Sequence, residues 1–382
     1  MIKSKIDFLL LTKVNSLSDG KKIKCIIKAK NVLALKNFLK NKKIEVYKEY
    51  LFINSFLVGL TKKEIESLSR LISVEYIYSV ATANAMIDVS KKILGVNNVD
   101  VDGKGVTAAI IDTGVSPHFD FYIGKKRIKK SIDFVNNKNY AYDDNGHGSF
   151  VCGVMAGSGA ESAGVLAGVA PQIDIISLKA LDKNGEAYSN KILDAMEWVF
   201  ENHKKENIRV VCMSFGSEPL GYDDPIKIGA EALWREGVIV VSAAGNSGPE
   251  NQTIKSPGVS SKIITVGGID DNRIGKTFNR DYFEIAEFSS RGPAFNRFKP
   301  DVVAPAVDIS SCSRSGGYTT LSGTSVATPM VAGLMCLLCQ KYPNITPEKA
   351  KQMLIKNCKP ITFNKNLEGW GLPDFYKLLI NN

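Results

Sequence analysis

Apolar residues in the first 80 positions change between strand-like and helix-like spacing. Ile23, Cys25 and Ile27 alternate with polar neighbours, as in a half-buried strand, whereas residues 32–39 place apolar side chains on one helix face. Further strands are predicted at 44–50, 52–58 and 74–80, and a helix at 61–72 that begins with a capping box. The order βαββαβ is the split-βαβ, ferredoxin-like pattern, and an unrelated small α/β unit is the alternative.

From about residue 88 the apolar residues gather in continuous runs that alternate with helical stretches. Strands are predicted at 106–111, 173–178, 210–213, 238–242 and 263–266, and helices at 189–203, 225–236, 325–341 and 347–357. Continuous apolar strands separated by helices indicate a parallel sheet with helices on both faces. Asp112 follows the first strand and Asn246 lies just beyond the fourth, at the edge where such sheets bind ligands.

The two patterns divide the chain into a small α+β unit, residues 1–85, and a larger α/β unit, residues 86–382. A length of 382 residues suits two domains. The net charge is +10, but residues 1–80 contain 16 Lys and Arg against 7 Asp and Glu, so the larger unit is nearly neutral. Because basic and aromatic residues are not interleaved, nucleic-acid binding is not expected.

The apolar runs and the cysteines indicate the cellular compartment in which the protein is expected. The apolar run at 8–11 is too short for a signal-peptide core, and no run approaches the length of a membrane span. Seven scattered cysteines do not form a disulfide framework. These features predict a cytoplasmic protein with no membrane partner. Cys336 and Cys339 form a C-x-x-C pair inside an apolar helical run, and we interpret them as core residues rather than a metal or redox pair.

Three short segments contain an acid, a base and a nucleophile. Asp112 stands in Ile-Asp-Thr-Gly (111–114), His147 in Asn-Gly-His-Gly (145–148) and Ser325 in Gly-Thr-Ser-Val-Ala-Thr-Pro (323–329). Taken singly, they could be a turn residue, a helix residue and a helix cap. Together, in the order Asp, His, Ser, they resemble the signature blocks of the subtilisin-like serine proteases, the subtilases. The resemblance extends over nearly all of residues 100–375.

The resemblance implies a subtilisin-like parallel sheet and a role for each of these residues. Ser325 attacks the scissile carbonyl, His147 accepts its proton, and Asp112 orients the imidazole. Asn246, in the glycine-rich segment 243–248, is the expected side-chain donor to the oxyanion, together with the N–H of Ser325. The other histidines, His118 and His203, are expected to be structural or solvated.

The same resemblance implies a peptide-binding strand and a pocket for the residue before the cut. Ser214, Phe215 and Gly216 are expected to pair with the substrate main chain and, with Ala243, Ala244 and Gly245, to wall the pocket. Lys255 is expected at its base. A lysine there either favours an acidic substrate side chain or extends its stem to solvent.

No cofactor is required for this chemistry, and no metal ligand set is expected. Residues 156–168 lack the Asn-bearing calcium loop of secreted subtilisins and resemble intracellular, AprX-like members of the family. A structural calcium ion therefore remains an open question. The pair Asp143 and Asp144 is interpreted as a solvated loop rather than a metal site.

Residues 1–85, placed ahead of such a protease, resemble a prodomain that assists folding and inhibits its own enzyme. The small, mostly uncharged residues 78–89 suit a product-like tail, so self-cleavage is expected at about 79–90. The expected partners are protein or peptide substrates and the prodomain itself. The leading hypothesis is an autoprocessed serine endopeptidase. A dedicated maturation protease for one precursor and a non-catalytic pseudoprotease that binds peptides are the alternatives.

Overall fold

The computed structural model describes residues 5–6, 10, 20–79, 93–96, 100–122, 126–272 and 280–380. It divides into two compact units, Met1–Ala83 and Asn84–Asn382. The division lies two residues before the expected boundary after residue 85. Each unit has its own hydrophobic core. Among the described residues, no helix is both long enough and apolar enough to cross a membrane.

Within its described residues, the N-terminal unit consists mainly of a four-stranded antiparallel sheet and two longer helices. Its elements are β1 (Ile23–Ala29), α2 (Val32–Asn41), β2 (Val46–Tyr50), β3 (Ser55–Leu60), α3 (Lys62–Ser69) and β4 (Val74–Ser79). The strand order β2-β3-β1-β4, antiparallel throughout, is a ferredoxin-like arrangement. Thr61 and Glu64 form the expected capping box at the start of α3. The third strand begins later than predicted because a 3-10 turn, Leu51–Ile53, precedes it.

The larger unit is built on an eight-stranded sheet with the order β11-β10-β9-β8-β5-β7-β6, to which β12 adds by pairing with β10. Its strands are β5 (Thr107–Asp112), β6 (Ile128–Asp133), β7 (Asp174–Lys179), β8 (Ile208–Met213), β9 (Ile239–Ala243), β10 (Ile264–Asp270), β11 (Glu284–Ile285) and β12 (Val302–Pro305). Neighbouring strands are parallel except for β10 and β11. The five predicted strands are all present. The pattern missed β6, whose exposed Lys129 and Lys130 interrupt the apolar run, and it also missed the short strands β11 and β12.

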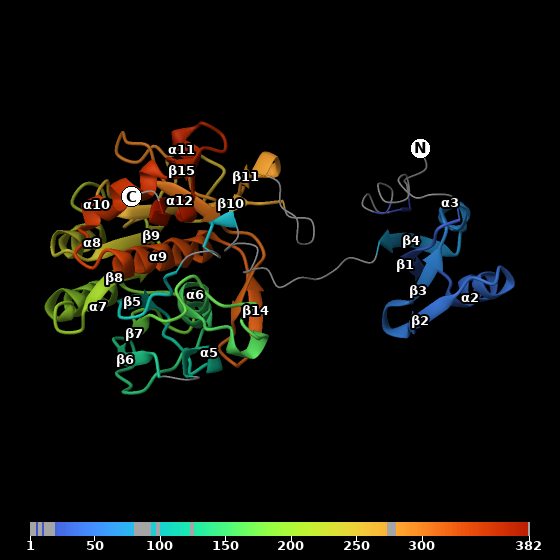
Figure 1. Ribbon diagram of the computed structural model, residues 1–382, viewed down its shortest axis with the longest axis horizontal. Coiled ribbons are helices and arrows are strands. Elements are labelled where there is room, and N and C mark those ends of the chain that lie inside the picture. Colours follow the sequence, from blue (N-terminus) through green and yellow to red (C-terminus); the bar gives the residue numbers. More distant parts are fainter. Residues whose placement is uncertain are drawn as a thin grey trace. The chain divides into compact units, whose positions relative to one another are not determined.

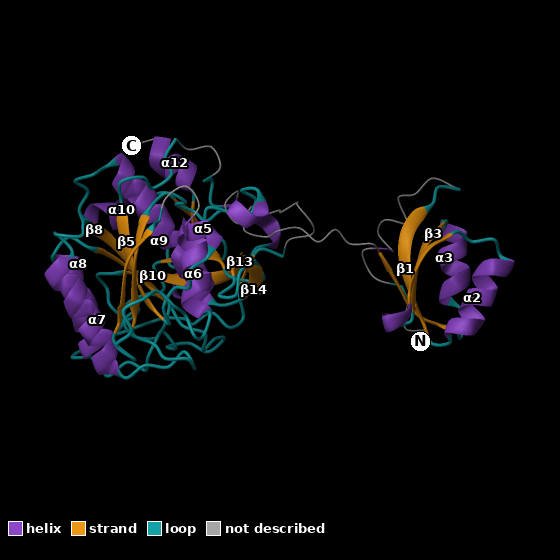
Figure 2. Cartoon of the chain, turned by 90° about the horizontal axis from the view of Figure 1, so that it is seen from below, coloured by secondary structure: helices purple, strands orange, loops and turns teal. Residues whose placement is uncertain are grey.

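Helices cover both faces of this sheet, as Figures 1 and 2 show. The longer ones are α6 (His147–Ala156), α7 (Ser189–Asn202), α8 (Pro225–Arg235), α9 (Thr324–Lys341) and α10 (Pro347–Lys356), and the short ones are α5 (Phe119–Tyr122), α11 (Lys365–Glu368) and α12 (Phe375–Ile380). A small hairpin joins β13 (Ile309–Cys312) with β14 (Tyr318–Leu321). The short strands β15 (Cys358–Lys359) and β16 (Leu372–Pro373) also pair antiparallel, on either side of α11. Helices α6 and α9 pack together on one face, whereas α7 and α8 pack together on the other.

Helix α9 is the central element of the core. Every residue from Val326 to Cys339 is buried, and the helix packs across β8, β9 and β10. This burial explains why its apolar pattern has no polar face. The C-x-x-C pair is part of the core, as expected, and burial raises the pKa of Cys339 to about 11.

Candidate active site

Asp112 is the last residue of β5, a central strand between β7 and β8. Its side chain is 1% exposed, and Oδ1 accepts hydrogen bonds from His147 Nδ1 at 2.8 Å and from the N–H of Thr113 at 2.7 Å. Within the described residues Oδ2 is buried without a hydrogen-bond partner. Among the described residues, the imidazole and one backbone N–H are therefore the hydrogen-bond donors to this buried carboxylate.

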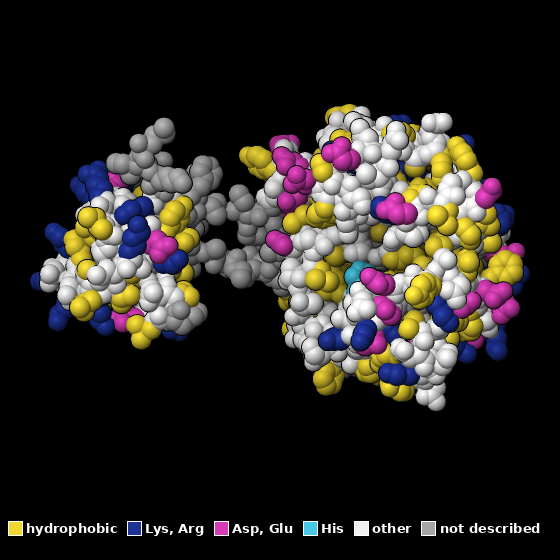
Figure 3. Space-filling model, turned by 180° about the vertical axis from the view of Figure 1, so that it is seen from behind, with side chains coloured by type: hydrophobic (Ala, Val, Ile, Leu, Met, Phe, Trp, Pro, Cys, Tyr) yellow, Lys and Arg dark blue, Asp and Glu magenta, His cyan; other side chains and the backbone are white. Residues whose placement is uncertain are grey.

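His147 begins α6, and its side chain is 26% exposed. Burial lowers the pKa of His147, but the charge and hydrogen bond of Asp112 and the charge of Asp143 outweigh it, so the pKa lies above its usual 6.5. Gly148 allows α6 to approach β5, since a Cβ there would lie 2.1 Å from the carbonyl oxygen of Gly114. On the face shown in Figure 3, a histidine side chain (cyan) lies in a hollow bordered by acidic side chains.

Ser325 is the second residue of α9 and is half-buried. A Cβ placed on Gly323 would lie 3.2 Å from both Ser325 Oγ and Asn246 Nδ2, so the serine and the amide border the same small space. Among the described residues, no hydrogen bond joins Ser325 to His147. The structure thus pairs Asp112 with His147 and brings Ser325 beside Asn246. Hydrogen bonds to a catalytic serine are often long without substrate.

Thr324 fixes the orientation of the Asn246 amide. Asn246 Oδ1 accepts hydrogen bonds from the Thr324 N–H at 2.8 Å and from its hydroxyl at 2.9 Å. Because a backbone N–H can only donate, the atom facing it must be the amide oxygen, and the NH2 group points to the other side. Thr324 Oγ1 also accepts from the N–H of Gly245 at 3.2 Å. Our sequence reasoning missed this role, although Thr324 directly precedes Ser325.

The first turn of α9 leaves a backbone donor beside Ser325. The N–H groups of Thr324 and Val326 bond to Asn246 and to the carbonyl of Gly323, whereas that of Ser325 has no intrahelical acceptor. The positive end of the helix dipole lies at the same place. A negatively charged oxygen bound here would be stabilised by the N–H of Ser325, by the side-chain NH2 of Asn246 and by the helix dipole.

The segment after β8 and the loop after β9 are joined through residues 217 and 256. The N–H groups of Ser217 and Ser256 each donate to the other's carbonyl at 2.9 Å. Lys255 packs against both Gly216 and Gly245. A Cβ built on Gly216 would lie 2.5 Å from Lys255 Cβ, and one built on Gly245 would lie 2.5 Å from Lys255 Cγ. Its side chain is 17% exposed, and its ammonium group pairs with exposed Glu218. The sequence analysis did not identify Glu218.

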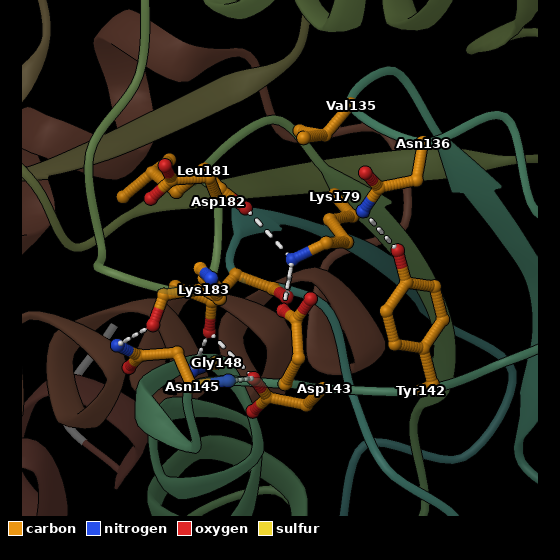
Figure 4. Close-up of polar contacts among 12 residues, drawn as sticks. Val135, Asn136, Tyr142, Asp143, Asn145, Gly148, Lys179, Leu181, Asp182 and Lys183 are labelled. Atoms are coloured by element: carbon orange, nitrogen blue, oxygen red, sulfur yellow. Dashed lines mark hydrogen bonds and ion pairs between the residues drawn. The ribbon is translucent and has the colours of Figure 1, made fainter.

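The interpretation of Asp143 as part of a solvated loop was wrong. Asp143 is 6% exposed, and Oδ1 accepts from the Thr113 hydroxyl and from the N–H groups of Asn145 and Gly146. Oδ2 accepts from the N–H and hydroxyl of Ser149. Figure 4 shows Asp143 near Asn145 and Gly148, where the loop enters α6. This charge can be buried because five hydrogen-bond donors converge on the carboxylate.

One group of side chains has the composition of a metal site. Ligand atoms of His118, Asp120 and Cys312 lie within 4.8 Å of one another and are buried. Asp120 already accepts from the Tyr318 hydroxyl at 3.0 Å, the N–H of Gly159 at 2.9 Å and the Cys312 thiol at 3.5 Å. Burial raises the pKa of the Cys312 thiol, which keeps it protonated and able to donate. The group is therefore a self-satisfied hydrogen-bond network.

A carboxylate–imidazole pair at the end of a central strand, with a serine and an amide at the start of a buried helix, defines a serine-hydrolase type of site. Residues 103–371 match the Subtilase family, Peptidase_S8. The chain therefore belongs to the subtilase family and is a subtilisin-type serine peptidase.

Relatives of this chain include proteases of similar length. The chain is similar to serine protease AprX of Bacillus subtilis (strain 168), with 38% identity over 82% of this chain and 76% of the relative. It is also 29% identical to a thermostable alkaline protease of Halalkalibacterium halodurans, over 93% of this chain and 91% of that protein. Among solved structures it resembles a cold-adapted subtilisin-like serine proteinase, with a TM-score of 0.62, 28% identity, and coverage of 76% of this chain and 99% of that one.

Proposed function

We propose that this chain is an endopeptidase that hydrolyses peptide bonds through an acyl-enzyme on Ser325. The observation that carries the proposal is the 2.8 Å bond between Asp112 and His147, at the sheet edge that also holds Ser325 and Asn246. Proteases dominate the relatives, which supports a peptide substrate.

The reaction follows from the roles of these groups. Ser325 Oγ attacks the scissile carbonyl carbon while His147 Nε2 takes its proton, and Asp112 holds Nδ1–H and stabilises the imidazolium. The oxyanion accepts hydrogen bonds from Asn246 Nδ2 and the N–H of Ser325. His147 then protonates the departing amine, leaving the acyl-enzyme. A water molecule, deprotonated by His147, attacks this ester and restores Ser325.

A serine-directed fluorophosphonate probe tests catalysis against the pseudoprotease alternative. The processed wild-type protein should become labelled at Ser325, and Ser325→Ala should not. A wild-type protein that folds but takes up no probe and cleaves no peptide would establish the pseudoprotease instead.

We further propose that residues 1–85 act as an inhibitory prodomain that the enzyme removes. The ferredoxin-like fold of this unit supports the idea, as does the alkaline protease alignment, which covers 93% of the chain and so extends into the unit. Apart from Ser79, the expected cleavage region at about 79–90 lies outside the described residues. Ser325→Ala should stay at 41.7 kDa, whereas the wild type should gain a new N-terminus in this region. Wild type that stays intact after folding would contradict self-cleavage.

The substrate range is proposed to depend on Lys255. Its pairing with Glu218 supports the idea that the ammonium group can take a carboxylate, including one from an acidic substrate side chain. Cleavage of a diverse peptide mixture by the wild type and by Lys255→Gly would test this. The same experiment separates a broad degradative enzyme from a dedicated maturation protease, because the latter should cut few sites.

We also propose that the enzyme works in the cytoplasm and needs no cofactor. Its cysteines form no disulfide among the described residues, and six of the seven are buried, which suits a reducing compartment. Activity that is unchanged after exhaustive chelation would support independence from calcium, and activity that returns only on adding calcium would overturn it.

A further inference from the structure

Lys179 is a fully buried cation whose ammonium protons are all used in hydrogen bonds. It is the last residue of β7, and its side chain is 1% exposed. Nζ donates to the carbonyl oxygens of Thr113 at 2.7 Å and Leu181 at 2.9 Å, and to Asp144 Oδ1 at 2.6 Å. Figure 4 shows the amine pointing away from its strand, toward the segment that contains Asp143 and Asn145.

Two of these bonds join the segments that hold the catalytic acid and base, and the third returns to Leu181, two residues after Lys179. Thr113 directly follows Asp112 at the end of β5, and Asp144 lies in the loop three residues before His147. The neighbouring Asp143 provides a second link, because it accepts from the Thr113 hydroxyl and from the N–H of Gly146. Thr113 Oγ1 in turn accepts from the N–H of Gly148 at 2.8 Å.

We propose that Lys179 is a positioning residue that sets the spacing of Asp112 and His147 through Asp144 and the Thr113 carbonyl. Burying an ammonium group costs desolvation free energy, and a well-packed apolar side chain would be less costly for stability alone. The ammonium group does what an apolar side chain cannot, since it holds three oxygens from three separate segments at fixed distances. The proposal rests on the protease function proposed above.

Lys299 provides a matched control elsewhere in the same unit. Its side chain is 2% exposed, and Nζ donates to Asp301 Oδ2 at 2.6 Å and to Thr265 Oγ1 at 2.8 Å. None of these partners belongs to the segments that hold Asp112 and His147. Replacing either lysine with methionine removes a buried amine from its carboxylate partner, so a purely structural role predicts the same behaviour for both variants.

The kinetic test compares Lys179→Met with Lys299→Met, counting active sites by fluorophosphonate titration. Per titrated site, we expect Lys179→Met to lower kcat roughly tenfold to a hundredfold, since misplacement by about 1 Å can have an effect of that size. KM for a peptide should change less than about twofold, and Lys299→Met should keep wild-type kcat despite a lower Tm. Asp144→Asn, at a partly exposed position, should fold and lose several-fold in kcat. Wild-type kcat per site in both Lys179→Met and Asp144→Asn would overturn the proposal.

A second readout needs no turnover, so it separates this proposal from the protease function. In a Ser325→Ala background, proton NMR should show a strongly deshielded His147 Nδ1–H bound to Asp112. The signal should weaken or vanish in Lys179→Met and Asp144→Asn but persist in Lys299→Met. An unchanged signal in all three variants would refute the positioning role, whether or not the wild type cleaves peptides.

Discussion

Replacing Thr324 with valine tests how much the hydrogen bond from the Thr324 hydroxyl contributes to the action of the Asn246 amide. Valine keeps the shape of the buried side chain and the backbone N–H that donates to Asn246 Oδ1. It removes the hydroxyl that donates to Asn246 and accepts from the N–H of Gly245. The change therefore loosens the amide without removing it.

The magnitude follows from the two lost hydrogen bonds. One bond to Asn246 is worth roughly 0.5–1.5 kcal/mol. If it acts mainly when the oxyanion forms, kcat should fall about two- to tenfold. Removing the amide itself costs about 10²–10³ in kcat, a value measured on a subtilisin. The unsatisfied Gly245 N–H should lower the free energy of unfolding by about 1–3 kcal/mol.

A double-mutant cycle with steady-state kinetics is the assay. Thr324→Val should lower kcat in the wild-type background but have almost no further effect in Asn246→Ala, because the amide it supports is gone. Thr324→Ser, which keeps the hydroxyl, should restore kcat. An equal loss of kcat in both backgrounds would refute the reasoning, since the effect would then not pass through Asn246.

Three further predictions concern charge and substrate choice. The pKa of His147 lies above its usual value, so kcat/KM should fall with decreasing pH at a midpoint above 6.5. Asp143→Asn should move this midpoint to lower pH. An unmoved midpoint in pH profiles would contradict the role of the Asp143 charge. Lys255→Gly should reduce cleavage after acidic residues relative to neutral ones in peptide profiling, and an unchanged preference would reject the pocket hypothesis. Burial lowers the pKa of Lys299 to about 7, so between about pH 7 and 10 the unfolded chain binds a proton that the native state lacks and stability should rise with pH. Urea unfolding of Ser325→Ala should show this rise, and adding Lys299→Met should remove it; equal slopes would contradict the prediction.

The sequence predicted the sheet well because its strands are apolar on both faces. Thr107–Asp112 is buried at all six positions, so its pattern needs no knowledge of its neighbours. The edge strand Ile128–Asp133 was missed because exposed lysines break the run. Asp112, His147, Ser325 and Asn246 were proposed as site residues because the segments around them, taken together and in order, resemble the signature blocks of the subtilases.

The supporting contacts could not be predicted from local patterns. Asp143 resembles a solvated turn residue until five donors from segments around it are assembled. Lys179 reaches Thr113 across 66 positions, and Lys255 reaches Glu218 across 37. Such pairings depend on which strand ends meet in space, and a single sequence does not contain that information.

The position of Ser325 at the start of α9 has a consequence for any protease that is exposed to other copies of itself. Local opening in proteins is easiest at elements with few buried contacts, and proteases cut what has opened. A helix buried along its whole central length opens only with the rest of its unit. Ser325, the proposed nucleophile, is thus carried by one of the last segments expected to become cleavable. Cleavage by other copies of the protein should therefore begin at peripheral loops. Helix α9, which carries Ser325, should stay intact until the whole unit unfolds.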